Sequence, residues 1–406
     1  MNQKLWALLL LGSLAAYGAG PQDTPQAIST HARPGPATPA RTNPRPSPSP
    51  RPLSPKQGGL MVDTARRFYS LAELKGFVDV VRRSGGQFLH LHLSDDQNYT
   101  LESEILGQTR AGALNEPAGY RNRRQGNRFY SREQIAELVR YANAAGVELV
   151  PEIDLPGHAG FIHRLLRAQD PAKARRIFSN DGYAQVDEDG GREALAFTRE
   201  LYEEVAAQFR GNSKHFHMGG DEFPGDIANN QAYVNYANGV AETLQRRGLT
   251  PRLWNDAVLT AQLGKLNKNI EITYWDWDGD RQDPAERAAN LKYRASVGEL
   301  VRQGYRVLNY NHYYLYHIVG PNSADAAATD TRRIQEPQWH IGRWDETSTH
   351  NAVAPKLMYG AAVAIWNEEK PYPLPAADLQ RFIEPQLRAL LQKVRAAEKP
   401  TPARRH

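Results

Sequence analysis

The sequence predicts an α/β fold, a (β/α)8 barrel in one domain, and three observations support this fold class. Short apolar runs alternate with amphipathic helical patterns from Gly58 onward, which is typical of a parallel sheet covered by helices. Eight such runs over about 340 residues suit a closed barrel with loop insertions. No glycine-rich nucleotide loop follows the first run, where Asp63-Thr64-Ala65-Arg66 stands instead. That absence disfavours the alternative, a doubly wound open sheet.

Residues 1–20 have the pattern of a secretory signal peptide. Lys4 precedes an apolar run, Leu5 to Ala16, which ends in Gly18-Ala19-Gly20. A basic start, a short apolar core and a small-residue exit are typical of such signals. The run is shorter than the roughly 20 apolar residues that a stable membrane anchor needs. We therefore expect a secreted protein, extracellular or periplasmic, with no stable membrane anchor; an ordinary N-terminal helix is the alternative.

Residues 21–56 are rich in proline and predict an extended, disordered linker. They contain 11 of the 27 prolines and too little apolar surface to offset the entropy of ordering. The first 56 residues carry six Lys/Arg and one Asp, which accounts for the whole formal net charge of +5. The rest of the chain is therefore neutral, and nucleic acid is not an expected partner. Cysteine is absent, which excludes disulfides, thiolate metal sites and a cysteine nucleophile.

Residues 57–398 are predicted to form the barrel, and residues 399–406 a basic tail. Ser70-x-x-Glu73 and Ser131-x-x-Gln134 are capping boxes that each open an amphipathic helix, and Gly146 ends the second one. Further helices are predicted over Glu193–Phe209, Asn229–Arg247, Ser296–Gln303 and Ala377–Ala396. The predicted strands are Gly59–Asp63, Phe88–Ser94, Glu148–Asp154, His215–Gly219, Arg252–Asn255, Ile270–Trp275, Arg306–Asn311 and Ala361–Trp366.

Polar and aromatic residues lie at the ends of all eight predicted strands. In a barrel these ends converge on the C-terminal face, where barrel active sites are assembled. Eight such ends in succession therefore predict a functional site rather than ordinary solvent-exposed polar residues. The residues concerned are Asp63, Arg66, His92, Asp95, Glu152, Asp154, His158, His217, Asp221, Glu222, Trp254, Asn255, Asp256, Trp275, Asp276, Tyr310, Asn311, Tyr314, Trp366 and Glu368.

The segment His217-Met218-Gly219-Gly220-Asp221-Glu222 is the strongest local signal. Its two glycines allow a sharp turn or a close approach of the backbone to a ligand. Two neighbouring carboxyls in an apolar surround can differ in pKa, so that a protonated acid coexists with a carboxylate. This division suits hydrolysis of a glycosidic bond, which needs a proton donor and a nearby anion. A metal site is the alternative, but no metal-binding motif supports it, and neither a metal nor a cofactor is predicted.

Several segments in order resemble glycoside hydrolase family 20, the β-N-acetylhexosaminidases, whose signature is His-x-Gly-Gly-Asp-Glu. The resemblance covers about residues 59–369, almost the whole globular part. Within the family, the chain is most similar to the subgroup that degrades biofilm polysaccharide. Besides the signature, the matching segments are Val62–Tyr69, Leu89–Asp95, Pro151–His158, Ile270–Trp275, Val307–Asn311 and Tyr313–Tyr316.

The resemblance implies a retaining mechanism in which the acetamido oxygen of the substrate, not an enzyme carboxylate, attacks the anomeric carbon. Carried over by position, Glu222 protonates the leaving oxygen and then activates water, Asp221 orients the acetamido N–H, and Tyr314 hydrogen-bonds the acetamido oxygen. The expected substrate-binding residues are Arg66, Trp254, Trp275, Trp366, Glu368, Asp280 and Asp283, and the residues expected to brace the pocket are Asp154, His158 and His217.

The expected substrate is a polymer with β-linked N-acetylglucosamine, and the subgroup resemblance indicates poly-β-1,6-N-acetylglucosamine of the biofilm matrix. A general exo-β-N-acetylhexosaminidase, acting on chitin oligosaccharides or glycan ends, is the nearest alternative. A non-catalytic sugar-binding barrel is an alternative of another class, but it would not require Asp221, Glu222 and Tyr314 together. Pro224-Gly225 stands where the subgroup has an aromatic residue, which leaves the preference between endo and exo cleavage open.

Overall fold

Eight parallel strands close into a barrel, because the last of them pairs with the first. Residues Gln57–Val62 of β1 lie in register with Gly360–Ile365 of β12, and each other strand pairs with the next strand around the barrel. Each predicted strand overlaps one of the eight, so the predicted fold class is confirmed. They are β1 (Gln57–Asp63), β2 (Phe88–His92), β6 (Glu148–Glu152), β7 (His215–His217), β8 (Thr250–Trp254), β9 (Glu271–Tyr274), β10 (Val307–Asn309) and β12 (Gly360–Trp366).

The structure, a computed structural model, describes residues 56–179, 182–186, 191–223, 230–279, 283–344 and 351–398. The predicted signal peptide, the basic tail and the linker up to residue 55 lie outside the described residues. Lys56, placed at the end of the linker by the sequence, is buried and bonded to the barrel. Within the described part, no helix has the length and the apolar character that crossing a bilayer would require.

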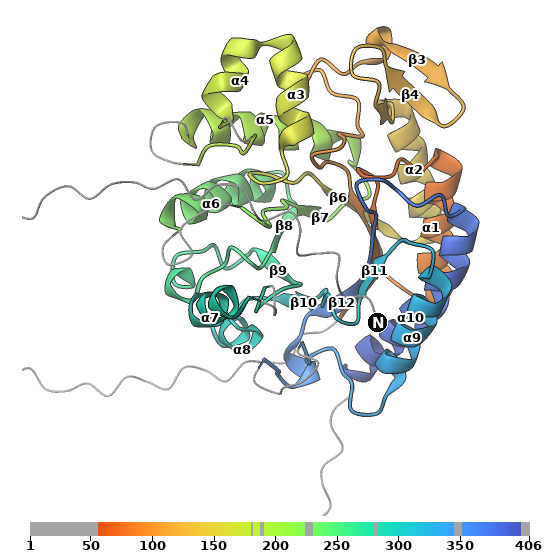
Figure 1. Cartoon of the computed structure of the whole chain (residues 1–406), viewed down its shortest axis with the longest axis vertical. Helices are drawn as coiled ribbons and strands as arrows, with labels where there is room; N and C mark the ends of the chain where they lie inside the picture. Colours follow the sequence, from red (N-terminus) through yellow and green to blue (C-terminus); the bar gives the residue numbers. More distant parts are fainter. Residues whose placement is uncertain are drawn as a thin grey trace, which may run out of the picture. The chain divides into compact units, whose positions relative to one another are not determined.

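Helices surround the strands (Figure 1). The two predicted capping boxes are present at Ser70 and Ser131, and Gly146 ends α2 with a φ of +68°. The sequence did not predict α3, α4, α7 and α9. The helices are α1 (Leu71–Ser84), α2 (Arg132–Ala145), α3 (Gly160–Gln169), α4 (Pro171–Ile177), α5 (Gly191–Gln208), α6 (Gln231–Arg246), α7 (Pro284–Tyr293), α8 (Val297–Arg302), α9 (Ser323–Gln335) and α10 (Ala376–Ala396), with 3-10 turns at Arg110–Gly112, Thr260–Gln262 and Pro355–Leu357.

The seventh barrel strand consists of two pieces. After β10, a turn leads into β11 (Tyr316–Ile318), which also pairs with β12. Tyr316 lies in register with Ala364, and paired residues of neighbouring strands point to the same face of a sheet. Because Ala364 belongs to the small apolar cluster inside the barrel, the side chain of Tyr316 also points inward.

Apolar side chains form a large core between the strands and the helices and a smaller one inside the barrel. The inner core consists of Met61, Phe88, Val150, Trp254, Leu308, Tyr310, Ala362, Ala364 and Trp366, with Trp275 and Tyr316 packed against it. The connection from β2 to α2 carries an antiparallel sheet that the sequence did not predict. It consists of β3 (Ala113–Glu116), β4 (Gly119–Asn122) and β5 (Arg128–Phe129).

Candidate active site

Two glycines after β7 allow the following carboxyl groups to lie against the neighbouring strand. Gly219 and Gly220 have φ values of +71° and +90°, which L side chains rarely adopt. A Cβ on Gly219 would lie 2.0 Å from Oδ1 of Asp154, and a Cβ on Gly220 would lie 2.5 Å from the hydroxyl of Tyr233. The signature glycines are therefore required both by conformation and by space, and they bring Asp221 to Asp154.

The buried Asp154 and the partly buried Asp221 form a pair of adjacent carboxyls. One Asp154 oxygen accepts the Gly220 N–H at 2.7 Å. The other oxygen of Asp154 and Oδ1 of Asp221 have no hydrogen-bond partner within the described structure. Burial, followed by the charge of Asp154, raises the pKa of Asp221 well above its usual range, and burial likewise raises the pKa of Asp154. The pair therefore retains a proton to higher pH than an exposed carboxyl would.

Glu222 is paired with a histidine rather than with a carboxyl. Its side chain is 55% exposed, and Oε2 lies 3.3 Å from Nε2 of His158. The other ring nitrogen of His158 lies 3.6 Å from oxygens of both Asp95 and Asp96. The hydrogen bond with His158 lowers the pKa of Glu222. Burial opposes the charge on His158, but the surrounding carboxylates, Asp95 foremost, raise its pKa well above 6.5.

Arg66 joins this group from the loop after β1. Its guanidinium lies 2.6 Å from Asp95 and 3.3 Å from Asp63, and it lies over the ring of Trp366, 5.4 Å from the centroid. Its side chain is 18% exposed, so it retains a surface that a ligand could reach. Neighbouring carboxylates hold Arg66 fully charged, although burial opposes this.

The three predicted tryptophans lie close to one another at the C-terminal end of the barrel. Trp254 is buried, and its ring lies 6.2 Å from that of Trp366. Trp275 and Trp366 both pack against Tyr316, whose ring centroid is 6.0 Å from the first and 5.7 Å from the second. The ring of Trp275 is almost parallel to that of Tyr316, at 8°. Such an aromatic group can enclose an apolar part of a ligand.

Tyr314 has different apolar neighbours from these aromatic residues. Tyr314 belongs to the outer core and packs edge-on against Trp339, with ring centroids 5.9 Å apart. Tyr316, two residues later, belongs to the inner core instead. In the described contacts Tyr316, rather than Tyr314, therefore packs against the pocket tryptophans, and which of the two meets the acetamido oxygen stays a prediction. The sequence offers both tyrosines in Tyr313-Tyr314-Leu315-Tyr316, and only the register of β11 distinguishes them.

The other predicted residues lie in different surroundings. Glu368 is exposed just after β12. Asp283 is exposed and caps α7, where its Oδ1 accepts the N–H groups of Ala285 and Glu286 at 2.9 and 3.1 Å. Asp280 lies outside the described residues. Of the predicted ligand-binding polar residues, the described contacts bring only Arg66 to the pocket aromatics.

Glu152, a buried carboxylate for which the sequence predicted no individual role, lies beside Trp254. Glu152 accepts the Nε1–H of Trp254 at 2.7 Å and lies 2.8 to 3.1 Å from ring nitrogens of His92, His90 and His217. His90, Glu152 and His217 have the composition of a metal-ligand set. However, the indole N–H can only donate, and Glu152 is already surrounded by nitrogen groups, so this arrangement favours a hydrogen-bonded carboxylate. His217 thus supports Trp254 through Glu152.

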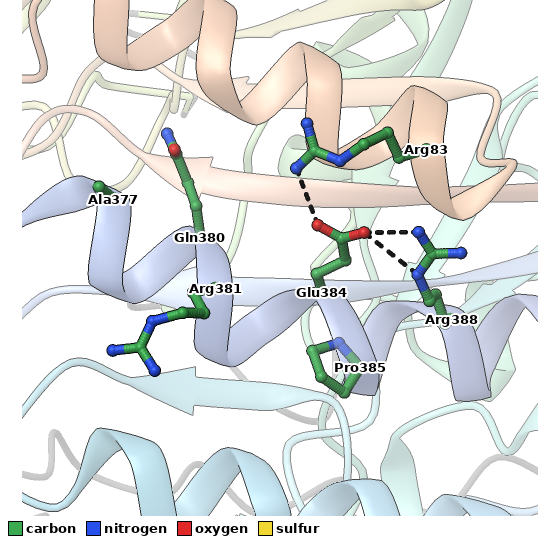
Figure 2. Close-up of a pocket in the computed structure, with 7 residues that line it drawn as sticks. All are labelled: Arg83, Ala377, Gln380, Arg381, Glu384, Pro385 and Arg388. Carbon is green, nitrogen blue, oxygen red and sulfur yellow. Dashed lines mark hydrogen bonds and ion pairs between the residues drawn. The ribbon is translucent and has the colours of Figure 1, made fainter.

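A shallow pocket on the outer surface is separate from this site. It has a volume of about 460 Å³ and lies between α1 and α10. Figure 2 shows Glu384 between Arg83 and Arg388, which it pairs with at 2.8 and 2.6 Å. None of the residues lining it belongs to the predicted site. They are Arg83, Ala377, Gln380, Arg381, Glu384, Pro385 and Arg388.

Comparison with known proteins agrees with this site. The family description "Glycosyl hydrolase family 20, catalytic domain" matches residues 57–372. The crystal structure of dispersin B superposes with a TM-score of 0.77 and 37% identity, covering 84% of this chain and 99% of that one. A lacto-N-biosidase of Bifidobacterium bifidum is 24% identical over 59% of this chain, and a β-N-acetylhexosaminidase of Cellulomonas fimi is 25% identical over 76%.

The alignments cover only part of those two enzymes, namely 21% of the Bifidobacterium protein and 58% of the Cellulomonas protein. The match to dispersin B, in contrast, extends over nearly the whole of that chain at a level of identity well above that of a shared fold alone. The family match also includes every barrel strand and both carboxyls of the signature. The chain belongs to glycosyl hydrolase family 20.

Proposed function

We propose that the protein is a β-N-acetylhexosaminidase that hydrolyses β-linked N-acetylglucosamine by substrate-assisted catalysis. One observation carries this proposal. Two adjacent carboxyls differ in surroundings, since Asp221 is partly buried and lies against the carboxyl of Asp154, whereas Glu222 is exposed and paired with His158. In a retaining glycosidase whose nucleophile is an enzyme side chain, a second carboxylate lies where it can attack the anomeric carbon. In an enzyme whose substrate supplies the nucleophile, that carboxylate is replaced by a residue that orients the substrate's amide.

In the first step, the acetamido oxygen bonds to the anomeric carbon as the bond from that carbon to the leaving oxygen breaks. The leaving oxygen takes a proton from Glu222, and the sugar becomes an oxazolinium ion. Asp221 accepts a hydrogen bond from the acetamido N–H and stabilises the positive charge. The hydroxyl of Tyr316 donates to the acetamido oxygen, a role supported by its protonated state, because burial raises the pKa of Tyr316 well above 10.

The proton for this step belongs to the pair formed by His158 and Glu222. Their opposite pKa shifts favour a charged His158 beside a Glu222 carboxylate. The proton moves to Glu222 as the leaving oxygen develops negative charge, and Asp95 and Asp96 stabilise His158 throughout. In the second step, Glu222 removes a proton from water, and the water oxygen bonds to the anomeric carbon as the bond from that carbon to the acetamido oxygen breaks. The acetamide is restored, the configuration is retained, and the proton returns from Glu222 to His158.

The aromatic group supplies the binding surface. Trp275, Trp366 and Tyr316 are arranged to contact the apolar faces of the sugar and its methyl group. Arg66, and Glu368 from the loop after β12, would bind sugar hydroxyls through charge-assisted hydrogen bonds. Asp280 and Asp283 remain candidates for contacts with a neighbouring sugar unit.

Hydrolysis of 4-nitrophenyl N-acetyl-β-glucosaminide by the wild type and by Glu222→Gln tests the activity. We expect kcat/KM to fall at least about a hundredfold, the lower range for general acid–base catalysis. A second substrate, with the acetamide replaced by hydroxyl, should be cleaved at a negligible rate by the wild type. Equal cleavage of both substrates would contradict substrate-assisted catalysis, and absence of any cleavage by the wild type would favour a sugar-binding protein.

We further propose poly-β-1,6-N-acetylglucosamine of a biofilm matrix as the substrate. The similarity to dispersin B over almost its whole length supports this choice over a general exo-hexosaminidase. The curated relatives named β-hexosaminidase support the alternative. Rates on β-1,6 and β-1,4 oligomers of equal length discriminate between the two, and the sizes of the products from intact polymer distinguish endo from exo cleavage. A preference for the β-1,4 oligomer would overturn the biofilm substrate.

Export of the protein is also proposed, on the basis of the apolar run from Leu5 to Ala16. It agrees with a substrate that lies outside the cell. Fractionation of cells that express the full chain, compared with a chain without residues 1–20, tests it. We expect the activity outside the cytoplasm only for the full chain.

A further inference from the structure

Asp256 contacts two parts of the proposed active site at once. It lies two residues after the end of β8 and is 6% exposed. Its Oδ2 accepts the backbone N–H of Glu222 at 2.8 Å. Its Oδ1 accepts the indole N–H of Trp275 at 3.1 Å. The two carboxylate oxygens therefore join the loop after β7 to the loop after β9.

The bond to Glu222 supports an unfavourable backbone conformation. Glu222 has a φ of +47°, in the left-handed region that residues other than glycine rarely adopt. Such conformations persist where surrounding contacts hold them in place, and they are frequent at active sites. The described contacts of Glu222 hold it at two points, with Asp256 at the backbone and His158 at the carboxylate. The direction of the Glu222 side chain therefore depends on Asp256.

The bond to Trp275 fixes the opposite wall of the pocket. The indole N–H meets Asp256, and the Trp275 backbone N–H donates to the side chain of the adjacent Asn255 at 2.7 Å. The Trp275 ring lies parallel to Tyr316. Asn255 and Asp256 thus hold Trp275 at two points, and the ring cannot rotate without breaking the bond to Asp256.

We infer that Asp256 is a positioning residue that sets the location of the proton donor Glu222 relative to the aromatic wall at Trp275. The inference deepens the proposed function and rests on it, because it concerns the proton that Glu222 gives to the leaving oxygen. Asp256 itself does not exchange a proton with the substrate. It is needed because a proton donor is effective only within hydrogen-bond reach of the leaving oxygen.

Dependence on the leaving group separates this role from a general structural one. A good leaving group, such as dinitrophenol, departs with little protonation, whereas a poor one, such as methoxyphenol, needs the acid. Loss of Asp256 should therefore slow the poor leaving group more than the good one. A collapsed pocket would slow both equally, because both carry the same sugar.

The experiment measures kcat and KM for Asp256→Ala and Asp256→Asn on the dinitrophenyl and methoxyphenyl N-acetyl-β-glucosaminides. For Asp256→Ala we expect kcat on the methoxyphenyl substrate to fall roughly tenfold further than on the dinitrophenyl one, part of the range for general acid catalysis. Asp256→Asn keeps one acceptor oxygen, so its ratio of the two kcat values should lie between those of Asp256→Ala and the wild type. It also provides the measurement if Asp256→Ala does not fold.

Two further variants complete the design. Asp278→Asn is the matched control, since Asp278 is also a buried carboxyl near β9 but accepts from Tyr313 at 3.1 Å; it should leave the ratio of the two rates unchanged. Trp275→Phe keeps the bond between Asp256 and Glu222 and should raise KM on both substrates without changing that ratio. Equal losses on both substrates in the Asp256 variants, or no loss, would overturn the inference.

Glu222→Gln distinguishes a failure of this inference from a failure of the proposed function. If Glu222 is the acid, its variant must show the largest dependence on the leaving group. A Glu222 variant that loses both substrates equally would overturn the acid assignment, and the inference with it. If the rate loss depended strongly on the leaving group in Glu222→Gln but not in the Asp256 variants, only the role of Asp256 would be overturned.

Discussion

Tyr314 and Tyr316 are two residues apart but belong to different cores. Tyr316 lies between Trp275 and Trp366, whereas Tyr314 packs on Trp339 outside the barrel. We expect Tyr316→Phe to lower kcat/KM on an N-acetylglucosaminide roughly tenfold, because one hydrogen bond to the acetamido oxygen is lost. Tyr314→Phe should leave kcat/KM within about twofold of the wild type. The reverse result in steady-state kinetics would return the role to Tyr314.

His158 should determine how far activity extends into the alkaline range. The active pair keeps its proton on His158, whose pKa lies above 6.5, while the pKa of Glu222 lies below 4.5. In His158→Gln, only Glu222 can hold the proton, and Glu222 loses it at a pH near its own pKa. The alkaline limb of kcat/KM against pH should therefore move to lower pH.

The profile of the wild type provides the reference for this prediction, and circular dichroism checks the fold of the variant. An alkaline limb that stays in place would contradict the assignment of the proton to His158.

The buried pair of Asp154 and Asp221 should make the protein less stable as the pH rises. In the unfolded chain Asp154 loses its proton near pH 3.8, but in the folded protein burial raises its pKa. Above about pH 4 the folded state therefore binds more protons than the unfolded state, and the free energy of unfolding falls with rising pH. Asp154→Asn still accepts the Gly220 N–H but cannot ionise. Its melting temperature should exceed that of the wild type, and by more at about pH 8 than at about pH 4.

Thermal unfolding of both proteins at the two pH values is the measurement. An equal gain in melting temperature at both pH values would contradict the proposed ionisation of Asp154.

At the scale of elements, the sequence predicts what depends on local pattern. Each of the eight strands is an apolar run between breaks, and the capping boxes at Ser70 and Ser131 mark two helix starts. The strand β11 was not predicted, because Tyr313–Tyr316 continues the same aromatic run and only the pairing of Tyr316 with Ala364 reveals the intervening turn. Without that strand, the sequence alone does not distinguish the surroundings of Tyr314 from those of Tyr316.

Contacts between elements explain the rest of the site. The sequence marks Asp95, Glu152 and Asp256 as acids at strand ends, but their partners come from other strands. Asp95 meets Arg66, Glu152 meets Trp254, and Asp256 meets the backbone of Glu222. Local spacing contains no information on such pairs. The carboxyls of the signature could be predicted because Gly219 and Gly220 precede them in the same loop.

At the scale of the whole molecule, the closure of the barrel depends on a narrow contact between its first and last strands. A Cβ on Gly360 would lie 2.0 Å from the carbonyl oxygen of Gln57, so β12 approaches β1 too closely for a side chain at this point. Lys56, immediately before β1, joins the same region to two other segments. It lies at the end of the barrel opposite the active site, since β1 begins there.

Lys56 should therefore contribute to stability without contributing to catalysis. Its buried ammonium donates to the carbonyl oxygens of Lys356 and Met358 at 2.9 and 2.6 Å, and its backbone N–H donates to Glu398 at 2.7 Å. Lys56→Met keeps most of the side-chain volume but removes both ammonium bonds. We expect the free energy of unfolding in urea to fall by about 2 kcal/mol, the range for hydrogen bonds to a charged group.

Lys75→Met is the matched control for this substitution. Lys75 pairs with Glu137 at 2.5 Å on the surface, where both side chains are partly exposed, and such pairs contribute about 0–1 kcal/mol. Both variants should keep the wild-type kcat/KM, because Lys56 precedes β1 and Lys75 pairs with Glu137 between the outer helices α1 and α2. If Lys56→Met proved no more destabilising than Lys75→Met, closure of the barrel would depend on the pairing of β1 with β12 alone. A loss of kcat/KM in the folded Lys56 variant would instead show that the closure also shapes the active site.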